Sequence, residues 1–215
     1  DKTKAKNDKD GFNLVTFHAG AKGEISDTQR LEFAFRHQNK RQEFDGGVAL
    51  DDASQESVSK DTYGRVAHTY FAQGIPLEVV SSFSFADHKR EYYSTSPKYE
   101  YKGGLMKLAL QGNYFWDKKN ATSLALEEKR EEDRSKSSEL AKKKNDISSI
   151  WLNHHFEMER FFISLGGRYE DDELAPSRST YRVAPGIRLP WYELILKGAV
   201  STAYRSPTLF ELGDK

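Results

Sequence analysis

The feature that most constrains this chain is a two-residue alternation of apolar and polar side chains. Residues 28–40 read TQRLEFAFRHQNK. Alternate positions on one side of this segment are apolar or aromatic: Leu31, Phe33, Phe35 and His37. Because successive side chains of a strand point to opposite faces of its sheet, the pattern predicts a strand with one apolar and one polar face.

The same alternation recurs along the whole chain, and helical spacing does not fit it. It predicts about ten strands, near residues 11–22, 28–43, 61–72, 77–93, 103–116, 121–130, 147–156, 161–170, 180–189 and 193–205. No linker or change of composition divides them. We therefore expect a single all-β domain.

The connections between the predicted strands alternate in length. Short ones, such as QGIP and DKKN, alternate with long polar ones at 44–60, 94–102, 130–146 and 171–179. Short turns on one rim and long loops on the other are typical of transmembrane β-barrels. The sequence thus predicts an antiparallel transmembrane β-barrel segment. Its long loops would form an outer vestibule, most exposed from Asp45 to Lys60 and from Arg130 to Asp146.

The composition agrees with a barrel that has a polar lumen. The mean hydropathy is −0.78, as expected when every second strand residue faces water. The 33 basic and 33 acidic residues cancel, so no nucleic-acid partner is expected. Cysteine is absent, which excludes disulfides, thiolate metal ligands and cysteine nucleophiles.

No enzyme motif is present, so we expect neither catalytic residues nor a cofactor. His154 and His155 are adjacent and would point to opposite faces of a strand, where they cannot chelate one ion. Asp45, Asp51 and Asp52 are candidate Ca²⁺ ligands on a flexible loop. Solvated loop acids explain them more simply, because no spaced D-x-D-x-D-G loop is present.

Several arginines are predicted to lie on the polar side of their strands: Arg30, Arg36, Arg168, Arg182 and Arg188. In a barrel with a plugged lumen, such arginines have two uses. They contact the plug, which we favour, or they steer an anionic ligand, for which Arg36 is a candidate.

The segment AVSTAYRSPTLFEL, residues 199–212, resembles the barrel motif of TonB-dependent outer-membrane receptors. The residues that match this motif in order are Tyr204, Arg205, Ser206, Pro207, Thr208, Leu209 and Leu212. The stretches NDKDGF, EFDGG and FFISLGGRYEDDE resemble other parts of the same barrel, especially in the cobalamin and siderophore receptor branch. The similarity covers essentially the whole chain.

This resemblance implies a 22-stranded barrel around an N-terminal plug in the outer membrane of a Gram-negative bacterium. The implied partners are outer-membrane lipid, the plug, a periplasmic energy-coupling protein and a metal chelate, either cobalamin or a ferric siderophore. At about 21 residues per strand, 22 strands need roughly 460 residues. The chain is then expected to be about half a barrel, without plug or remaining strands.

Tyr99 and Tyr101, in the 94–102 connection, are candidate ligand contacts, since tyrosine offers a flat apolar surface beside a hydrogen-bonding group. Anchoring of a strand end is the simpler role for them. Two alternatives for the whole chain stay open. The first is a passive porin-like or adhesin-like barrel, which predicts no plug encoded upstream. The second is a soluble β-rich binding domain, which predicts cooperative folding without detergent.

Overall fold

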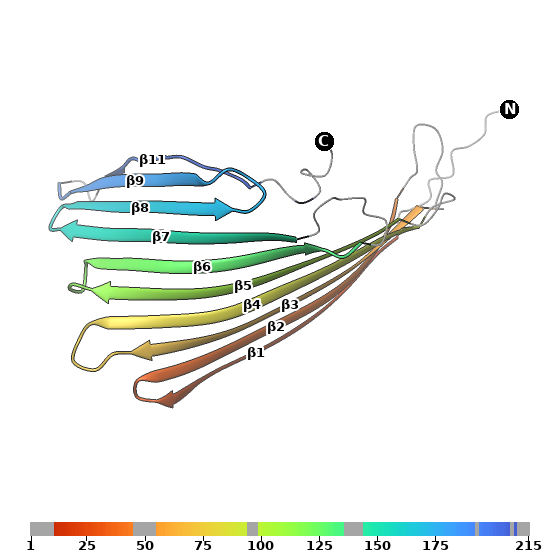
Figure 1. Ribbon diagram of the computed structural model, residues 1–215. Coiled ribbons are helices and arrows are strands. Elements are labelled where there is room, and N and C mark those ends of the chain that lie inside the picture. The colour runs from red at the N-terminus through yellow and green to blue at the C-terminus, as the bar shows by residue number, and fades with distance from the viewer. Residues whose placement is uncertain are drawn as a thin grey trace.

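The computed structural model describes residues 11–44, 55–93, 99–135, 144–191, 194–206 and 209. The described strands form one sheet in chain order from β1 to β10, with β11 also paired with β9 (Figure 1). They are β1 (Phe12–Ser26), β2 (Gln29–Phe44), β3 (Gln55–Phe71), β4 (Leu77–Tyr93), β5 (Tyr99–Phe115), β6 (Ala121–Asp133), β7 (Lys144–Met158), β8 (Phe161–Asp172), β9 (Arg178–Leu189), β10 (Leu194–Lys197) and β11 (Val200–Ser201). Every pairing is antiparallel. Within these ranges, no helix has the length and apolar character needed to cross a membrane.

The predicted strands are present, but several extend further into the long connections than the sequence indicated. β3 begins at Gln55 rather than near residue 61, and β7 begins at Lys144 rather than near residue 147. The prediction that Asp45 to Lys60 and Arg130 to Asp146 are loops is therefore wrong at their ends. Charged residues remain in strands here because they pair across the sheet, as Arg130 and Asp146 do at 2.7 Å.

The last predicted strand, 193–205, is interrupted rather than continuous. Its two parts, β10 and β11, both pair with β9. Between them, the backbone N–H of Gly198 donates to the carbonyl of Pro185 at 3.1 Å. Pro185 has no N–H with which to return a bond, so the regular ladder breaks at this position.

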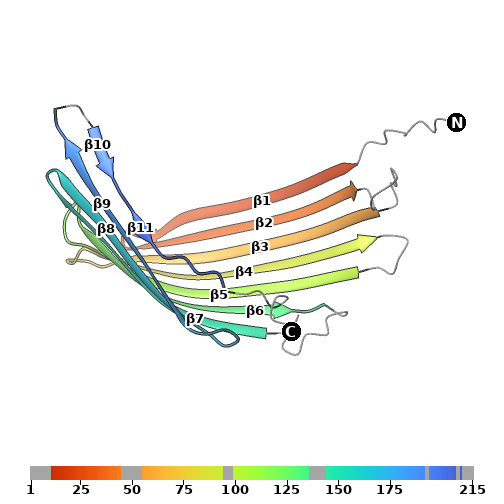
Figure 2. The same ribbon diagram turned by 90° about the horizontal axis from the view of Figure 1, so that it is seen from above.

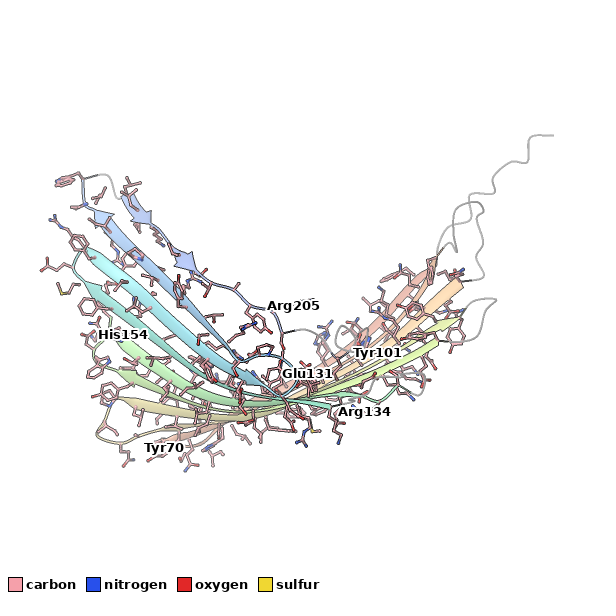
Figure 3. The ribbon with its side chains drawn as sticks, turned by 45° about the horizontal axis from the view of Figure 1, so that its top comes forward. Tyr70, Tyr101, Glu131, Arg134, His154 and Arg205 are labelled. Carbon is pink, nitrogen blue, oxygen red and sulfur yellow. The ribbon has the colours of Figure 1, made fainter. Side chains whose placement is uncertain are left out.

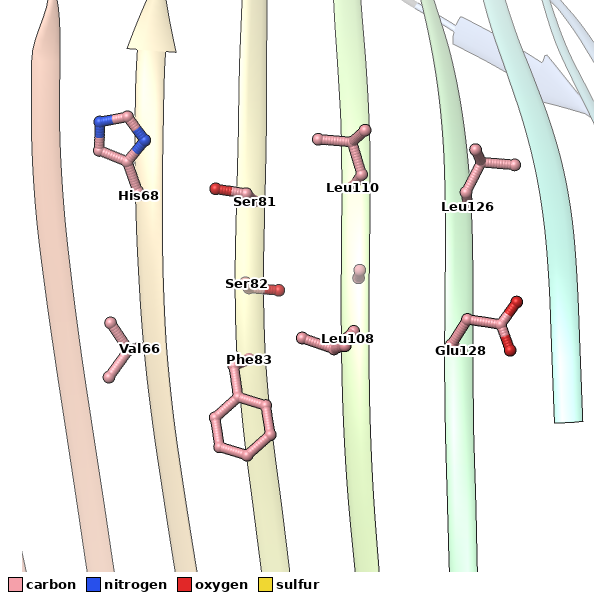
Figure 4. A pocket seen from close by; sticks show the side chains of 10 residues that line it. Val66, His68, Ser81, Ser82, Phe83, Leu108, Leu110, Leu126 and Glu128 are labelled. Carbon is pink, nitrogen blue, oxygen red and sulfur yellow. The ribbon is translucent and has the colours of Figure 1, made fainter. Parts of the chain in front are cut away.

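The strand register gathers the apolar side chains on one face of the sheet, called here the apolar face. Phe33 lies opposite Val66, Val66 opposite Phe83, and Phe83 opposite Leu108. The register confirms that Leu31, Phe33 and Phe35 share this face, and it places Ile163 and Leu165 there as well. Figure 4 shows a shallow groove on this face, beside Val66, Phe83 and Leu108. Phe33 is 44% exposed and Leu108 59% exposed, so a large apolar surface lies open.

The opposite face, called here the polar face, carries ion pairs along its strands. Lys22 pairs with Glu32 at 2.9 Å, and Lys107 pairs with Glu127 at 3.1 Å. Figure 2 shows the sheet bent into an open trough. Arg205, in the segment after β11, lies within the trough (Figure 3). The polar face is therefore the concave one.

A single sheet has no second layer to cover it, and the largest buried side chains gather under the segment after β11. Ile147 and Asn145 on the polar face of β7 are almost fully buried. Ser206 hydrogen-bonds to Asp172 on the neighbouring strand β8. Leu209 is only 9% exposed. This segment therefore covers part of the polar face.

The turn between β5 and β6 is organised by Asp117. Its carboxylate accepts hydrogen bonds from the backbone N–H groups of Lys119 and Asn120, at 2.7 and 2.9 Å, and from the Asn120 side chain at 2.6 Å. These bonds favour the ionised form, so they hold the pKa of the Asp117 carboxyl below its usual 3.8. The side-chain amide of Asn120 contributes most.

We expect Asp117→Ala to lower the melting temperature of the intact protein at pH 7. Because the folded-state pKa lies below the unfolded value, this contribution is present above about pH 3.8 and is lost as the pH falls through the lowered pKa. Thermal unfolding of both proteins at pH 7 and at pH 2.5–3 measures the difference. A melting-temperature difference that is the same at both pH values would contradict this role of the carboxylate.

Candidate ligand-binding site

Aromatic side chains gather on the polar face at the rim where the long connections lie. This rim aromatic patch consists of Phe44, His88, Tyr92, Tyr99 and Tyr101. The register explains the grouping, because Tyr92 lies directly opposite Tyr99 and His88 lies opposite Gly103, two residues from Tyr101. Residues two apart in a strand share a face, so the hairpin of β4 and β5 presents these rings together.

The rings of the patch are in contact distance of one another. Tyr92 is 6.5 Å from Phe44 in an edge-to-face arrangement and 6.2 Å from Tyr99, measured between ring centroids. The rings of His88 and Tyr101 are 5.8 Å apart. These separations fall in the range in which aromatic pairs attract each other.

Charge and hydrogen-bonding groups accompany the rings. The Arg90 guanidinium lies 6.0 Å from the centre of the Tyr92 ring and donates to its hydroxyl at 3.1 Å. His88 contacts the carboxylate of Asp61. Tyr99 is 45% exposed. The patch thus offers flat apolar surface, hydroxyl groups and one guanidinium to a molecule entering the trough.

A shallow depression of about 320 Å³ adjoins the patch, lined in part by Ala86, Tyr101, Gly103 and Leu209. Gly103 makes room for the Tyr101 side chain, since a Cβ atom at Gly103 would lie 2.9 Å from the Tyr101 hydroxyl oxygen. The Tyr101 ring therefore forms one wall of the depression.

Sequence analysis selected Tyr99 and Tyr101, and the structure places both side chains on the same face, in β5 rather than in a loop. Arg36 is not with them. It hydrogen-bonds to Gln38. Lys40 is the residue of β2 that lies in the same cross-strand row as Tyr101. Arg36 is four residues from Lys40, which is about 13 Å along the strand. A ligand-binding role for these three residues stays a prediction.

Phe44, His88 and Tyr92 belong to the patch but were missed as site residues. Their identities were visible in the sequence, and Tyr92 precedes the predicted connection 94–102 that contains Tyr99. Cross-strand pairing was needed to show that they share a face, because a shift of one residue in register would separate them.

The other predicted sites have mixed outcomes. Asp45, Asp51, Asp52, Pro207 and Leu212 lie outside the described residues. Tyr204 and Leu209 of the family motif lie within the described residues. The Tyr204 ring is 5.5 Å from the Arg178 guanidinium, and the Leu209 side chain is buried.

The two adjacent histidines lie on opposite faces, as predicted. His154 hydrogen-bonds to Thr122 at 2.8 Å on the apolar face, and His155 to Ser164 at 2.9 Å on the polar face. In the part of the chain that the structure describes, no three metal-ligating side chains lie together.

A curved antiparallel sheet with one apolar convex face, one ion-paired concave face and its long connections at one rim is the wall of a transmembrane β-barrel. The family model for "TonB dependent receptor-like, beta-barrel" matches residues 2–214. The chain belongs to this family of TonB-dependent receptor barrels, which are outer-membrane receptors rather than enzymes.

Solved structures show the same fold at low sequence identity. The siderophore receptor PirA from Acinetobacter baumannii matches with a TM-score of 0.67 and 14% identity over 93% of this chain and 34% of that one. A mutant of the ferric enterobactin receptor PfeA from Pseudomonas aeruginosa matches with a TM-score of 0.72 and 12% identity over 94% of this chain and 34% of that one. The chain thus spans about a third of each. The comparison with curated proteins found no match.

Proposed function

We propose that this chain forms part of the wall of an outer-membrane receptor that takes up a scarce metal chelate by energy-coupled transport. Membership in the TonB-dependent receptor family supports the receptor class. We further propose that the complete protein has 22 strands and a plug domain, that it sits in the outer membrane of a Gram-negative bacterium, and that a periplasmic energy-coupling protein acts on it through the plug.

The observation that carries the ligand-binding part of this proposal is the rim aromatic patch on the concave face. A large chelate cannot diffuse through a plugged barrel, so a receptor must first hold it at the outer opening. Tyr92, Tyr99 and Tyr101 lie at the rim with the long connections, where an incoming ligand arrives first. Their rings give affinity for flat groups, and Arg90 adds a positive charge suited to an anionic chelate.

A ferric siderophore is the first substrate class to test, and cobalamin is the second. The structural neighbours PirA and PfeA are siderophore receptors, and many siderophores present aromatic or anionic metal-binding groups. A patch of neighbouring tyrosine rings with a nearby guanidinium matches such groups in chemistry. Ca²⁺ bound by the loop acids Asp45, Asp51 and Asp52 stays a secondary proposal, tested by adding a chelator during ligand binding.

We expect the double replacement Tyr99→Ala and Tyr101→Ala in the intact receptor to weaken chelate binding about tenfold, because one exposed ring, one half-buried ring and both hydroxyl groups are lost. Equilibrium binding to purified receptor, with a panel of ferric siderophores and cobalamin, measures the effect.

Tyr93→Ala is the matched control for this experiment. Tyr93 lies next to the patch in sequence and at the same rim, but its side chain is on the opposite face. We expect it to leave the dissociation constant within about twofold. Unchanged binding of every chelate by a correctly assembled Tyr99/Tyr101 variant would contradict the proposed binding site.

A further inference from the structure

The five arginines of the polar face differ in how many carboxylate groups their side chains contact. Arg188 pairs with Glu157 at 3.0 Å. Arg168 pairs with Glu170 at 2.9 Å and with Glu127 at 3.3 Å. These two arginines are neutralised within the wall and have little charge to offer to another molecule.

The remaining three arginines have fewer acidic contacts. Arg30 lies 3.6 Å from Glu24, and Arg36 hydrogen-bonds only to the neutral Gln38 among the described residues. The Arg182 side chain makes no hydrogen bond, ion pair or ring contact within residues 11–44, 55–93, 99–135, 144–191, 194–206 and 209. Within the described wall, no carboxylate compensates the charge of Arg36 or Arg182, and only Arg182 has no side-chain partner of any kind.

The sheet register explains why Arg182 finds no carboxylate on its neighbouring strand. Its partner on β8 is Gly166. The nearest acidic residue on the polar face of β8 is Glu170, which lies opposite Arg178. Arg178 is four residues from Arg182, or about 13 Å along the strand, and Glu170 is already bound to Arg168. On the other side, β11 places Ser201 opposite Arg182.

Two depressions on this part of the sheet are both lined by Gly166 and Arg182. One depression, of about 420 Å³, is lined in part by Asn153, Gly166, Thr180, Arg182 and Ser201. A second, of about 390 Å³, shares Asn153, Gly166 and Arg182 with it. A Cβ atom at Gly166 would lie 2.6 Å from the Asn153 Oδ1 atom, so glycine at this position lets the Asn153 amide sit beside Arg182.

We propose that Arg182 is the centre of a carboxylate-binding subsite in the concave wall of the barrel. A guanidinium offers two parallel N–H donors that match the two oxygens of a carboxylate. The side-chain amide of Asn153 and the hydroxyl groups of Thr180 and Ser201 line the same depression and can donate further hydrogen bonds. The subsite holds one uncompensated positive charge, which favours an anion over a neutral ligand.

The carboxylate has two sources with the same chemistry. It belongs either to an acidic side chain of the domain that occupies the lumen, or to an anionic ligand in transit. The inference rests on the proposed function only in requiring that the concave face lines a lumen. Its test therefore uses melting temperatures, which do not depend on uptake.

The experiment uses the intact receptor in detergent and compares wild type, Arg182→Gln and Arg178→Gln, with citrate as the carboxylate probe. If the interior domain fills the subsite, Arg182→Gln lowers the melting temperature by about 2–4 °C. Citrate then changes the melting temperature of neither the wild type nor Arg182→Gln. If the subsite is open to ligands, millimolar citrate raises the melting temperature of wild type and of Arg178→Gln, but not of Arg182→Gln. Either result supports the subsite and identifies its source.

Arg178→Gln is the matched control because it removes the same charge from the same face of the same strand. Arg182→Lys serves as a second variant, since it keeps the charge but loses the paired donors and is expected to give roughly half of either effect. The proposal is overturned if Arg182→Gln matches wild type in both melting temperature and citrate response, or if Arg178→Gln reproduces its changes.

Discussion

Replacing Phe33 by arginine in the intact receptor is expected to destabilise the folded barrel by about 2–4 kcal/mol, the cost of a lipid-facing charge near the bilayer midplane. Phe33 lies on the apolar face opposite Val66 and is 44% exposed in this chain. In a membrane that exposed surface contacts hydrocarbon, where a guanidinium has no water and no carboxylate partner. Urea unfolding from lipid vesicles measures the loss.

The control for this prediction is Gln38→Arg, which places the same side chain on the polar face opposite Asp61 and should be tolerated. A depth-matched pair is also available, because Ser82 and Phe83 are neighbours with side chains on opposite faces. We expect Phe83→Arg to be costly and Ser82→Arg to be mild. Equal cost for both members of either pair would show that the register is displaced by one residue.

The second large effect concerns Gly64, which the Phe85 ring covers on the apolar face. A Cβ atom at Gly64 would lie 2.3 Å from a carbon of that ring, so any larger side chain forces the ring to move. Phe85 lies directly opposite Gly64 and is 6.5 Å from Phe83 between ring centroids. We expect Gly64→Val to cost about 1–3 kcal/mol through overpacking, measured by the same unfolding experiment.

Gly23→Val is the matched control for Gly64→Val. Gly23 lies on the same face, in β1 opposite Leu31, and a Cβ atom there would meet nothing within 4 Å. Valine is favoured in strands, so this change should be neutral or slightly stabilising. Similar losses at the two glycines would show that contact with the Phe85 ring does not determine the cost.

The ion pairs between residues on β6 and β7 show where sequence reasoning about boundaries was insufficient. Arg130, Glu132, Lys144 and Asp146 have the composition of a solvated loop, and the sequence placed them in one. Their pairing across two strands, Arg130 with Asp146 and Lys144 with Glu132, is a long-range contact. Local charge density does not reveal whether opposite charges will meet in register.

The candidate sites were predictable only in part, for the same reason. Tyr99 and Tyr101 could be selected from their position in the predicted long connection 94–102, but the contribution of Tyr92 depends on its pairing opposite Tyr99. Likewise, all five inward arginines have the same local pattern. The positions of Glu157, Glu170 and Gly166 on neighbouring strands distinguish Arg182 from Arg168 and Arg188.

The sequence by itself determined the strands and their two faces, because side-chain alternation is a local property with a period of two residues. It also determined which rim carries the long connections, since the turn lengths can be counted along the chain. Only the tertiary structure decided how far each strand extends, where Pro185 breaks the last ladder, and which rings and charges meet. Those features depend on the register between strands that are distant in sequence, and register is fixed by pairing across the whole sheet.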